Sequence, residues 1–470
     1  EIRFGTDGWR ALIARDFTFT NVAIVAQAYS EYLIDRGDAD RGVVISFDTR
    51  FMSSEFARTA AETISSNRIP VSLSRTVTPT PVLSYAVKHQ QATGGVMITA
   101  SHNPYQYSGI KFKDHYGGPA LPALTKSVES YLGRNKPAFN PQEIAKNLSE
   151  TDLFPAYEQA IHEYVRFDHI SRLRGKIIID LMHGAGIGVP ERFLTGDNIE
   201  LQCLHNEPDP LFGGRSPEPI LKNLPELVSV LQKENILAGF ATDGDADRFA
   251  VLDPKGKFVE LHDLMPLLLR YLIKSRGLKG RVVRTTSMAD TVDRMAEKLG
   301  GITVEEVPVG FKNIAEMMLM GDVILGGEES GGFGYYGFLP ERDGILSVLL
   351  VLEMMAAENR DLDSMVAELR DSYGPFVYGR IDRHFDLAVL QKNLNGLIKN
   401  TPEKIANYHV KSVNLIDGIK IYFREGAWML MRVSQTEPLA RIYVGGSEQQ
   451  MVDMILAAGE QLLTRTVGVK

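Results

Sequence analysis

Three aspartates alternate with small residues in the segment TDGDADR, residues 242–248. Asp243, Asp245 and Asp247 would repel one another unless a hard cation lay between them, and oxygen ligands favour Mg²⁺ or Ca²⁺. The spacing overlaps the start of a calcium loop, but no helix–loop–helix pattern surrounds it and no Glu stands at the twelfth position. Three carboxylates leave coordination positions open, so a bound ion could serve as an electrophile in phosphoryl transfer. Arg248, directly after the trio, disfavours a plain acidic turn.

A serine stands in the segment TASHNPYQYSGIK, residues 99–111, which leaves a predicted buried strand. We expect Ser101 to be exposed and held in one conformation, and it could act as a nucleophile if another group activates it. A turn that uses Ser and Asn as local caps is the plainer interpretation. Lys111 in the same excursion and the separate aspartate trio favour the chemical one, in which a phosphorylated serine fills an open position of the metal.

Two further segments carry groups suited to a sugar or an anion. The segment GGEESGG places Glu328, Glu329 and Ser330 between paired glycines, where carboxylates and a hydroxyl suit neutral sugar hydroxyls. An ordinary acidic turn would have the same composition. Upstream, Lys312 stands on a turn predicted to open a helix, which is a suitable place for an anion contact.

The segment RVSQTEP near the C-terminus is rich in groups that bind phosphate. Arg432, Ser434, Gln435 and Thr436 could present a guanidinium, two hydroxyls and amide donors around one phosphate. A strand-end turn before Pro438 is an equally good interpretation of these residues.

The elements between these segments must position them. Short β-branched runs end in turn residues at 41–50, 93–104, 175–186, 236–248, 281–287 and 321–332. Stretches between the runs have helical spacing, and in 18–36 one helical face would carry Val22, Val25, Tyr29 and Leu33. This alternation predicts parallel sheets covered by helices. Most of the polar segments fall just past a predicted strand, where open α/β sheets bind ligands.

The chain of 470 residues is too long for a single core. We expect an α/β protein with three similar α/β domains, whose sheets are mixed and mostly parallel, followed by a C-terminal α+β domain. The polar stretch 136–150 is expected to be a linker, 252–258 a hairpin turn, and 447–465 a final helix. The expected domain limits are 1–150, 151–253, 254–368 and 369–470.

The composition of the chain disfavours several classes of binding partner and metal site. The net charge of −8 gives no reason to expect a nucleic acid or an anionic membrane. The single cysteine, Cys203, excludes an internal disulfide and disfavours a cysteine-based zinc site. No apolar run approaches the roughly 20 residues that span a bilayer, and the charged N-terminal segment is unlike a signal peptide. We therefore expect a cytoplasmic monomer or homodimer that acts on small molecules.

In order, the segments FGTDGWR, TASHNPYQYSGIK, DGDADR, GGEESGG and RVSQTEP resemble the α-D-phosphohexomutases, the family of phosphoglucomutase, phosphomannomutase and phosphoglucosamine mutase. The resemblance runs from residue 4 to about residue 446. It implies an intramolecular phosphotransferase with four domains around a central cleft, each domain contributing one motif. It also implies that Ser101 is a phosphoserine, and that its phosphate with Asp243, Asp245 and Asp247 holds Mg²⁺.

The resemblance also implies roles for the neighbouring side chains. His102 and Lys111 would lie beside the transferring group, with Lys111 as general acid or base, while Arg10 would approach the reacting phosphate and Arg248 would lie beside the metal loop. The substrate contacts would be Glu328 and Ser330 to sugar hydroxyls, and Arg432, Ser434, Gln435 and Thr436 to the phosphate that does not react. Gln435 stands where the family more often has Gly or Asn, and Arg441 is a weaker candidate.

The implied reaction has two steps. Phosphoserine donates its phosphoryl group to a hexose 1- or 6-phosphate, and the bisphosphate then turns around and returns its other phosphate to Ser101. Glucose 1,6-bisphosphate would be the intermediate and activator. Glucose phosphates are the favoured substrates, because the segment GEES (327–330) and the preceding VPVGFK (307–312) look like those of glucose-phosphate mutases. Mannose phosphates are also possible, because glucose and mannose differ only at O2.

Three alternatives stay open. One is a phosphoglucosamine mutase, and another is a magnesium-dependent sugar phosphatase that uses the same phosphoserine. A separate pocket for a second phosphate disfavours the phosphatase, because simple hydrolysis does not need one. The third is a sugar-phosphate sensor without catalysis, which the intact Ser101, Lys111 and aspartate trio disfavour.

Overall fold

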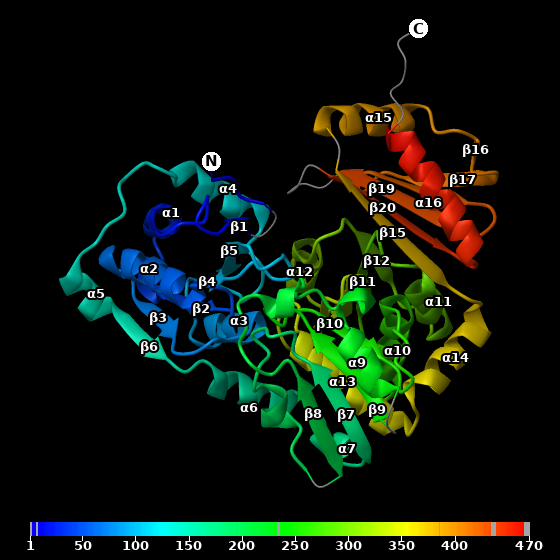
Figure 1. The fold of residues 1–470 in the computed structure, drawn as a ribbon, viewed down its shortest axis with the longest axis horizontal. Coiled ribbons are helices and arrows are strands. Elements are labelled where there is room, and N and C mark those ends of the chain that lie inside the picture. The colour runs from blue at the N-terminus through cyan, green and yellow to red at the C-terminus, as the bar shows by residue number, and fades with distance from the viewer. Residues whose placement is uncertain are drawn as a thin grey trace.

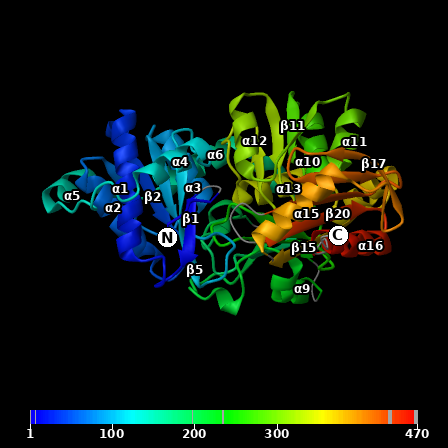
Figure 2. The same cartoon turned by 90° about the horizontal axis from the view of Figure 1, so that it is seen from above.

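The computed structural model describes residues 2–5, 8–196, 198–232, 236–384, 386–433 and 439–464. Four sheets follow one another along the chain. Figure 1 shows the four units along an arc, from the blue first unit on the left to the orange and red last unit on the upper right. The view from above in Figure 2 keeps the first unit at one end of the molecule and the third and fourth at the other.

The first sheet has six strands. Their order across the sheet is β1 (Gly8–Leu12), β5 (Tyr107–Asp114), β4 (Gly94–Ile98), β2 (Val43–Phe47), β3 (Val71–Ser74) and β6 (Leu148–Thr151). Strands β4, β2, β3 and β6 pair in parallel, whereas β5 runs antiparallel to both β4 and β1. The helices of this unit are α1 (Phe19–Arg36), α2 (Ser53–Ser66), α3 (Thr80–His89), α4 (Pro122–Tyr131) and α5 (Pro141–Asn147).

The second and third sheets have four strands each and share one design. Their orders are β10 (Phe249–Leu252), β9 (Ile236–Thr242), β7 (Gly175–Asp180), β8 (Ile199–Leu204), and β12 (Val304–Val307), β11 (Arg281–Thr285), β13 (Val323–Gly327), β14 (Phe333–Tyr335). In each sheet three strands are parallel and one edge strand, β10 or β14, returns antiparallel.

Nine helices among the described residues accompany these two sheets. The helices between β6 and β9 are α6 (Phe154–Tyr164), α7 (Phe167–Ile170), α8 (Pro190–Phe193) and α9 (Pro225–Leu231). Those after β10 are α10 (Leu261–Lys274), α11 (Thr291–Lys298), α12 (Phe311–Leu319), α13 (Gly344–Glu358) and α14 (Leu362–Tyr373).

The last sheet is antiparallel throughout. Its order is β15 (Val377–His384), β20 (Leu439–Gly446), β19 (Trp428–Val433), β18 (Ile419–Phe423), β17 (Tyr408–Asn414) and β16 (Lys404–Ile405), with helices α15 (Leu387–Lys399) and α16 (Gln449–Thr464). The predicted fold class is confirmed: three α/β units with mostly parallel sheets precede a C-terminal antiparallel unit.

Local chemistry explains where helix α1 begins and ends. The Thr18 hydroxyl accepts a hydrogen bond from the amide of Asn21, and Gly37 closes the helix with a φ of 82°. Only glycine adopts that left-handed conformation at little cost, which makes it the usual residue after a helix. The predicted face of Val22, Val25, Tyr29 and Leu33 is buried.

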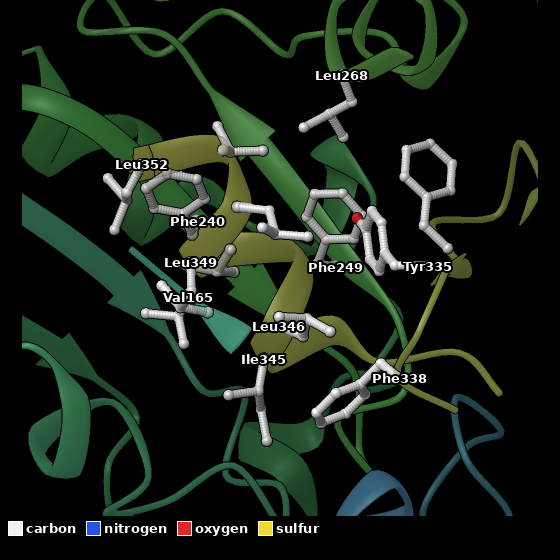
Figure 3. Packing of buried hydrophobic residues seen from close by; sticks show 14 of the residues in the cluster. Val165, Phe240, Phe249, Leu268, Tyr335, Phe338, Ile345, Leu346, Leu349 and Leu352 are labelled. Carbon is white, nitrogen blue, oxygen red and sulfur yellow. The ribbon is translucent and has the colours of Figure 1, made fainter. Parts of the chain in front are cut away.

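The clusters of buried hydrophobic side chains differ in how many units they span. One continuous cluster of buried side chains reaches from Val44 in the first unit to Leu369 in the third. Helix α13 lies within it, and Figure 3 shows Leu346 and Leu349 packed among Phe240, Phe249 and other side chains. The fourth unit has a core of its own, made of residues between 390 and 463. The first three units are therefore packed as one body.

One segment differs from its prediction. Residues 136–150 were expected to form a linker, but they contain helix α5, and strand β6 pairs in parallel with β3. The Asn140 side chain caps α5 by accepting from the amides of Gln142 and Glu143. Polarity and proline content are typical of linkers, yet an exposed edge strand and a short surface helix have the same composition. The turn at 252–258 is present, since the Asp253 amide donates to Lys257 O over 2.9 Å.

Candidate active site

The predicted motifs occupy equivalent places in the fold. In each of the first three units, the motif lies where a parallel strand turns back into an antiparallel neighbour: β4 to β5 for Ser101, β9 to β10 for the aspartates, and β13 to β14 for GEES. The fourth motif lies between β19 and β20, which are also antiparallel. These returns bring three loops, and Arg432 at the end of β19, to a common centre.

A cavity of about 430 Å³ lies at this centre. All four units contribute to its wall, and the predicted site residues in the wall are Arg10, His102, Arg248, Lys312, Glu328, Ser330 and Arg432. Ser101, Lys111 and the three aspartates do not line it. They are buried, whereas His102 and Arg248, which follow Ser101 and Asp247 in the sequence, do line the cavity.

The serine loop and the aspartate loop meet, as the sequence predicted. Ser101 Oγ donates a hydrogen bond to Asp243 Oδ2 over 2.9 Å, although the residues are 142 positions apart. Gly244 permits this contact, because a Cβ atom at that position would lie 2.6 Å from the Ser101 carbonyl oxygen. Ser101 was expected to be exposed, but only 1% of it is accessible because the aspartate loop packs over it.

The aspartate trio is fully buried. Carboxylate oxygens of Asp243, Asp245 and Asp247 lie within 4.8 Å of one another. Lys111 Nζ donates to Asp245 over 2.6 Å and to Asp247 over 3.2 Å. The Thr80 hydroxyl at the start of α3 donates to Asp245 Oδ2 over 2.7 Å. The loop is thus held by the first unit.

The electrostatics of the trio match a cation site. Burial and the charges of Asp245 and Asp247 raise the pKa of Asp243 well above its usual range. Burial also opposes ionisation of Asp245 and Asp247, but nearby cations, Lys111 and Arg342 foremost, outweigh it and lower the pKa of both carboxyls. A bound cation would relieve the repulsion that raises the pKa of Asp243.

Two carboxylate oxygens of the trio have no hydrogen-bond donor. Asp245 Oδ1 and Asp247 Oδ1 are buried without a partner in the part of the chain that the structure describes. Leaving a charged acceptor buried and unsatisfied is costly, so such oxygens are expected where a ligand binds. Together with Asp243 Oδ2 they form the all-oxygen donor set that Mg²⁺ prefers, and these residues therefore fit the ion.

Arg342 connects the aspartate loop to the GEES loop. Its Nη2 donates to Asp247 Oδ2 over 2.8 Å, and its Nη1 lies 3.6 Å from Glu328 Oε2. Neighbouring side chains of the same turn reach elsewhere, because Glu341 pairs with Lys113 of β5 and Asp343 accepts from the Tyr157 hydroxyl of α6. This turn joins three units around the site.

His102 and Arg10 lie on the cavity side of the serine. His102 Nδ1 is 3.5 Å from Ser101 Oγ, and Arg10 Nη1 donates to the Asn103 side chain over 2.6 Å. Burial, and then the charges of Arg248 and Arg10, lower the pKa of His102 well below its usual range. The imidazole is therefore neutral and can both accept and donate a hydrogen bond near the serine.

The side chains of the GEES loop, residues 327–330, differ in burial and in their partners. Glu328 is buried, and its Oε1 accepts from the amide of Gly310 over 2.9 Å. Burial raises the pKa of Glu328. Glu329 accepts a hydrogen bond from the Ser287 hydroxyl, whereas Ser330 and Lys312 lie in the cavity wall.

The fourth unit contributes guanidinium groups. Arg432 Nε lies 2.8 Å from Asp417 Oδ2, and Arg380 donates to Asp382 through two nitrogens. Arg441, a weaker candidate from the sequence, also lines the cavity. Ser434, Gln435 and Thr436 lie outside the described residues, so their predicted phosphate contacts remain proposals.

The cavity is cationic although the protein is acidic. Its described wall carries seven arginines and one lysine against three glutamates, while the whole chain has a net charge of −8. Clefts lined by one sign of charge concentrate ligands of the opposite sign. The arrangement suits a small molecule with two anionic ends.

Several cavity residues did not stand out in the sequence. Arg342 follows strand β14 in the polar turn ERDG, a strand-end signal like that of the other motifs. Arg380 and Tyr443 lie inside strands, where no local pattern marks them. Glu218 lies in a proline-rich loop that reads as ordinary turn sequence. No helix among the described residues is long and apolar enough to cross a membrane.

Family models match three parts of the chain. They describe the α/β/α domains I, II and III of phosphoglucomutase/phosphomannomutase, and they match residues 1–138, 155–256 and 261–373. The first three units of the fold thus correspond in order to the three family domains.

Individual proteins extend this similarity to nearly the whole chain. A probable phosphoglucosamine mutase of Methanobrevibacter smithii is 30% identical over 93% of both chains. A phosphoglucomutase/phosphomannomutase of Thermococcus kodakarensis is 27% identical over 98% of both. A crystal structure from Thermus thermophilus, provisionally named a phosphomannomutase, is 38% identical with a TM-score of 0.87 and covers 99% of both chains.

Proposed function

Because the chain belongs to the phosphoglucomutase/phosphomannomutase family, we propose that it interconverts hexose 1-phosphates and hexose 6-phosphates through a phosphorylated Ser101. The family consists of intramolecular phosphotransferases, and the chain is an enzyme of that class. One observation carries the proposal. Ser101 Oγ donates to Asp243 of a buried aspartate trio, in which Asp245 Oδ1 and Asp247 Oδ1 have no hydrogen-bond donor among the described residues.

The reacting end would be built from the first two units. Asp243, Asp245 and Asp247 would hold Mg²⁺, which when bound stabilises the negative charge of a transferring phosphoryl group. Lys111 would give or take the proton of the reacting hydroxyl, since its ammonium group lies in the same buried cluster. Neutral His102 and cationic Arg10 would orient the phosphate from the cavity side.

The other end of the cavity would hold the phosphate that does not react. Arg432 would supply charge there, with Ser434, Gln435 and Thr436 as further contacts, whereas Arg248 would lie beside the metal loop. Guanidinium groups bind phosphate with two parallel hydrogen bonds, which fixes the orientation of a ligand. Glu328 and Ser330 would accept and donate hydrogen bonds to the sugar between the two ends, so that either phosphate can face Ser101. Glucose 1,6-bisphosphate would then be the intermediate.

Glucose is our first candidate for the sugar, with mannose as a second substrate of the same site. A phosphoglucosamine mutase is the alternative, and the names of several relatives favour it. The carboxylate of Glu218 in the cavity wall is compatible with an amino sugar.

Kinetic assays with three sugars test the proposal. Purified protein with Mg²⁺ and catalytic glucose 1,6-bisphosphate is expected to convert glucose 1-phosphate with the highest kcat/KM, ahead of mannose 1-phosphate and glucosamine 1-phosphate. A first rank for glucosamine 1-phosphate would select the alternative. Release of free phosphate faster than isomer formation would instead identify a phosphatase.

Phosphosite mapping after incubation with glucose 1,6-bisphosphate tests the intermediate separately. We expect one phosphate on Ser101. A phosphate on another residue, or none in a protein that turns over substrate, would exclude the proposed route.

A further inference from the structure

A buried ion pair lies behind the serine loop, outside the cavity wall. Strand β2 ends at Phe47, and the next residues are Asp48, Thr49 and Arg50. Arg50 Nε donates to Asp48 Oδ2 over 3.0 Å, and neither side chain is accessible to solvent. Burying two charges in this way is expensive unless their remaining donors and acceptors are satisfied.

The other N–H groups of Arg50 donate hydrogen bonds to backbone carbonyls of the serine loop. Its Nη1 donates to Pro104 O and Tyr107 O over 3.0 and 2.9 Å. Its Nη2 donates to Ser101 O and Asn103 O over 2.5 and 2.8 Å. One planar guanidinium thus collects four carbonyls that turn inward from a single loop. An ammonium group has three donors without this fixed geometry and could not replace it.

Asp48 reaches the same serine from the other side. Its Oδ2 accepts from the Thr99 hydroxyl over 2.6 Å, and Thr99 Oγ1 in turn accepts from the amide of Ser101 over 2.8 Å. The carbonyl of Ser101 is held by Arg50 and its amide by Thr99, so both ends of the residue are tied to one ion pair.

The tie is needed because Ser101 has an unfavourable conformation. Its φ is 53°, in the left-handed region that residues other than glycine, asparagine and aspartate rarely adopt. Such conformations persist only where surrounding contacts enforce them. The same φ directs Oγ toward Asp243 in the neighbouring unit.

The second unit closes over the ion pair. The ring of Phe212 lies 4.9 Å from the Arg50 guanidinium carbon, and the Thr49 hydroxyl donates to His183 O over 2.7 Å. A guanidinium under an aromatic face is stabilised by the ring and shielded from water.

We propose that Arg50, held by Asp48, is a positioning residue that fixes the backbone of residues 101–107 and so aims Ser101 Oγ at the aspartate trio. The inference rests on the proposed function for its kinetic consequence, but not for its structural one. Arg50 is not part of the cavity wall and has no described hydrogen bond to Asp243, Asp245 or Asp247, although the charge of Asp245 acts on it, so its contacts reach the site through the loop.

The test compares Arg50→Lys with Arg276→Lys. Arg276 is also a buried arginine paired with a carboxylate, Glu353, but it lies outside the site. A displacement of about 1 Å at a reacting group costs about 100-fold in rate. We therefore expect Arg50→Lys to lower kcat by about 10- to 100-fold with KM changed less than about threefold, and Arg276→Lys to keep both constants. Amide hydrogen exchange across residues 99–108 should rise only in the first variant.

Thr99→Val gives a second route if Arg50→Lys does not fold. It removes the Thr99 hydroxyl, which joins Asp48 to the Ser101 amide by two hydrogen bonds, and leaves the Arg50 guanidinium in place. We again expect a lower kcat with little change in KM, but a smaller loss than in Arg50→Lys. Folded variants at position 50 or 99 with wild-type kcat and unchanged exchange would overturn the inference. A wild-type protein without mutase activity would instead reject the proposed function, while raised exchange in Arg50→Lys would still support the positioning role.

Discussion

The two ends of the cavity are held together in different ways. At the Ser101 end, each functional group pairs with a different unit: Ser101 with Asp243, Lys111 with Asp245, and Arg342 with Asp247. At the Arg432 end, the arginines pair with acids of their own unit, Asp417 and Asp382. The reacting end exists only when three units are packed. The ion pairs of the distal arginines form within the fourth unit, although Asp417 also accepts from the Val309 amide of the third unit.

The cores show the same difference. One hydrophobic cluster includes side chains of all of the first three units, although the first unit also has a core of its own, and the core of the fourth lies within that unit. The fourth unit joins the third through polar contacts, with Lys420 and Asn414 both donating to Glu306, and through ring contacts of His262 with Phe376 and Tyr378. The side chains of the reacting end are thus held by contacts between units, and the arginines of the distal end by ion pairs within one unit.

The largest expected effect on activity is that of Ser101→Ala at the reacting end. Removal of the nucleophile should lower kcat by about 10⁴-fold or more. Stability should change little, since only one hydrogen bond, worth about 1 kcal/mol, is lost. Steady-state kinetics and a thermal melt check both statements. Retained turnover would show that the reacting end has been misplaced.

Asp245→Asn should follow in size. It removes a carboxylate from the trio and the partner of Lys111, so the loss in kcat should exceed the roughly 100-fold cost of removing an outer partner of a metal. The activity should also require more Mg²⁺. Asp180→Asn is the matched control, because Asp180 is a buried carboxylate of the same sheet paired with His205. Equal magnesium dependence in the two variants would count against the site.

Arg432→Gln tests the distal end. Loss of a charged hydrogen bond to phosphate costs about 1.5–3 kcal/mol, which corresponds to a KM about 10- to 100-fold higher. The effect on kcat should be smaller, because the reacting end is intact. Arg383→Gln, an exposed arginine of the same unit paired with Glu460, should leave KM unchanged. A fall in kcat without a change in KM would contradict the division between the two ends.

The smallest effect on activity is expected at the junction between the third and fourth units, where the prediction concerns the dependence of stability on pH. His262 packs against Phe376 and Tyr378, and burial, with the charge of Lys420, lowers its pKa to about 3. The unfolded imidazole takes up a proton below about pH 6.5 while the folded one stays neutral, so the unfolded state binds more protons in this window. Stability should therefore fall as the pH drops from about 6.5 toward 3, by at most about 1.4 kcal/mol per pH unit.

Denaturant unfolding at several pH values checks this contribution. His262→Gln cannot titrate but can still accept from the Ala289 amide, as His262 Nδ1 does. Its acid sensitivity should be weaker than that of the wild type, while the exposed His115→Gln should behave like the wild type. Identical pH profiles for wild type and His262→Gln would show that the junction does not depend on this residue.

Much of the fold was predictable because its signals are local. Helical spacing at 18–36 and the β-branched runs reflect the periods of helix and strand, and the motifs at their ends reflect turn chemistry. The segment 136–150 was misinterpreted because its polarity describes exposure, and an exposed helix and edge strand share that polarity with a linker. The burial of Ser101 was missed because its cover comes from residues 142 positions away.

By itself, the sequence determined which chemical groups each loop carries: a hydroxyl at 101, three carboxylates near 245, and guanidinium groups near 432. These are properties of short segments, and side-chain chemistry does not depend on the fold. Only the tertiary structure decided which groups meet, that Lys111 lies between two aspartates, and that Arg50 and Arg342 serve the site from outside the motifs. Such pairings depend on packing between units, because the partners are brought together by sheets and cores rather than by their distance along the chain.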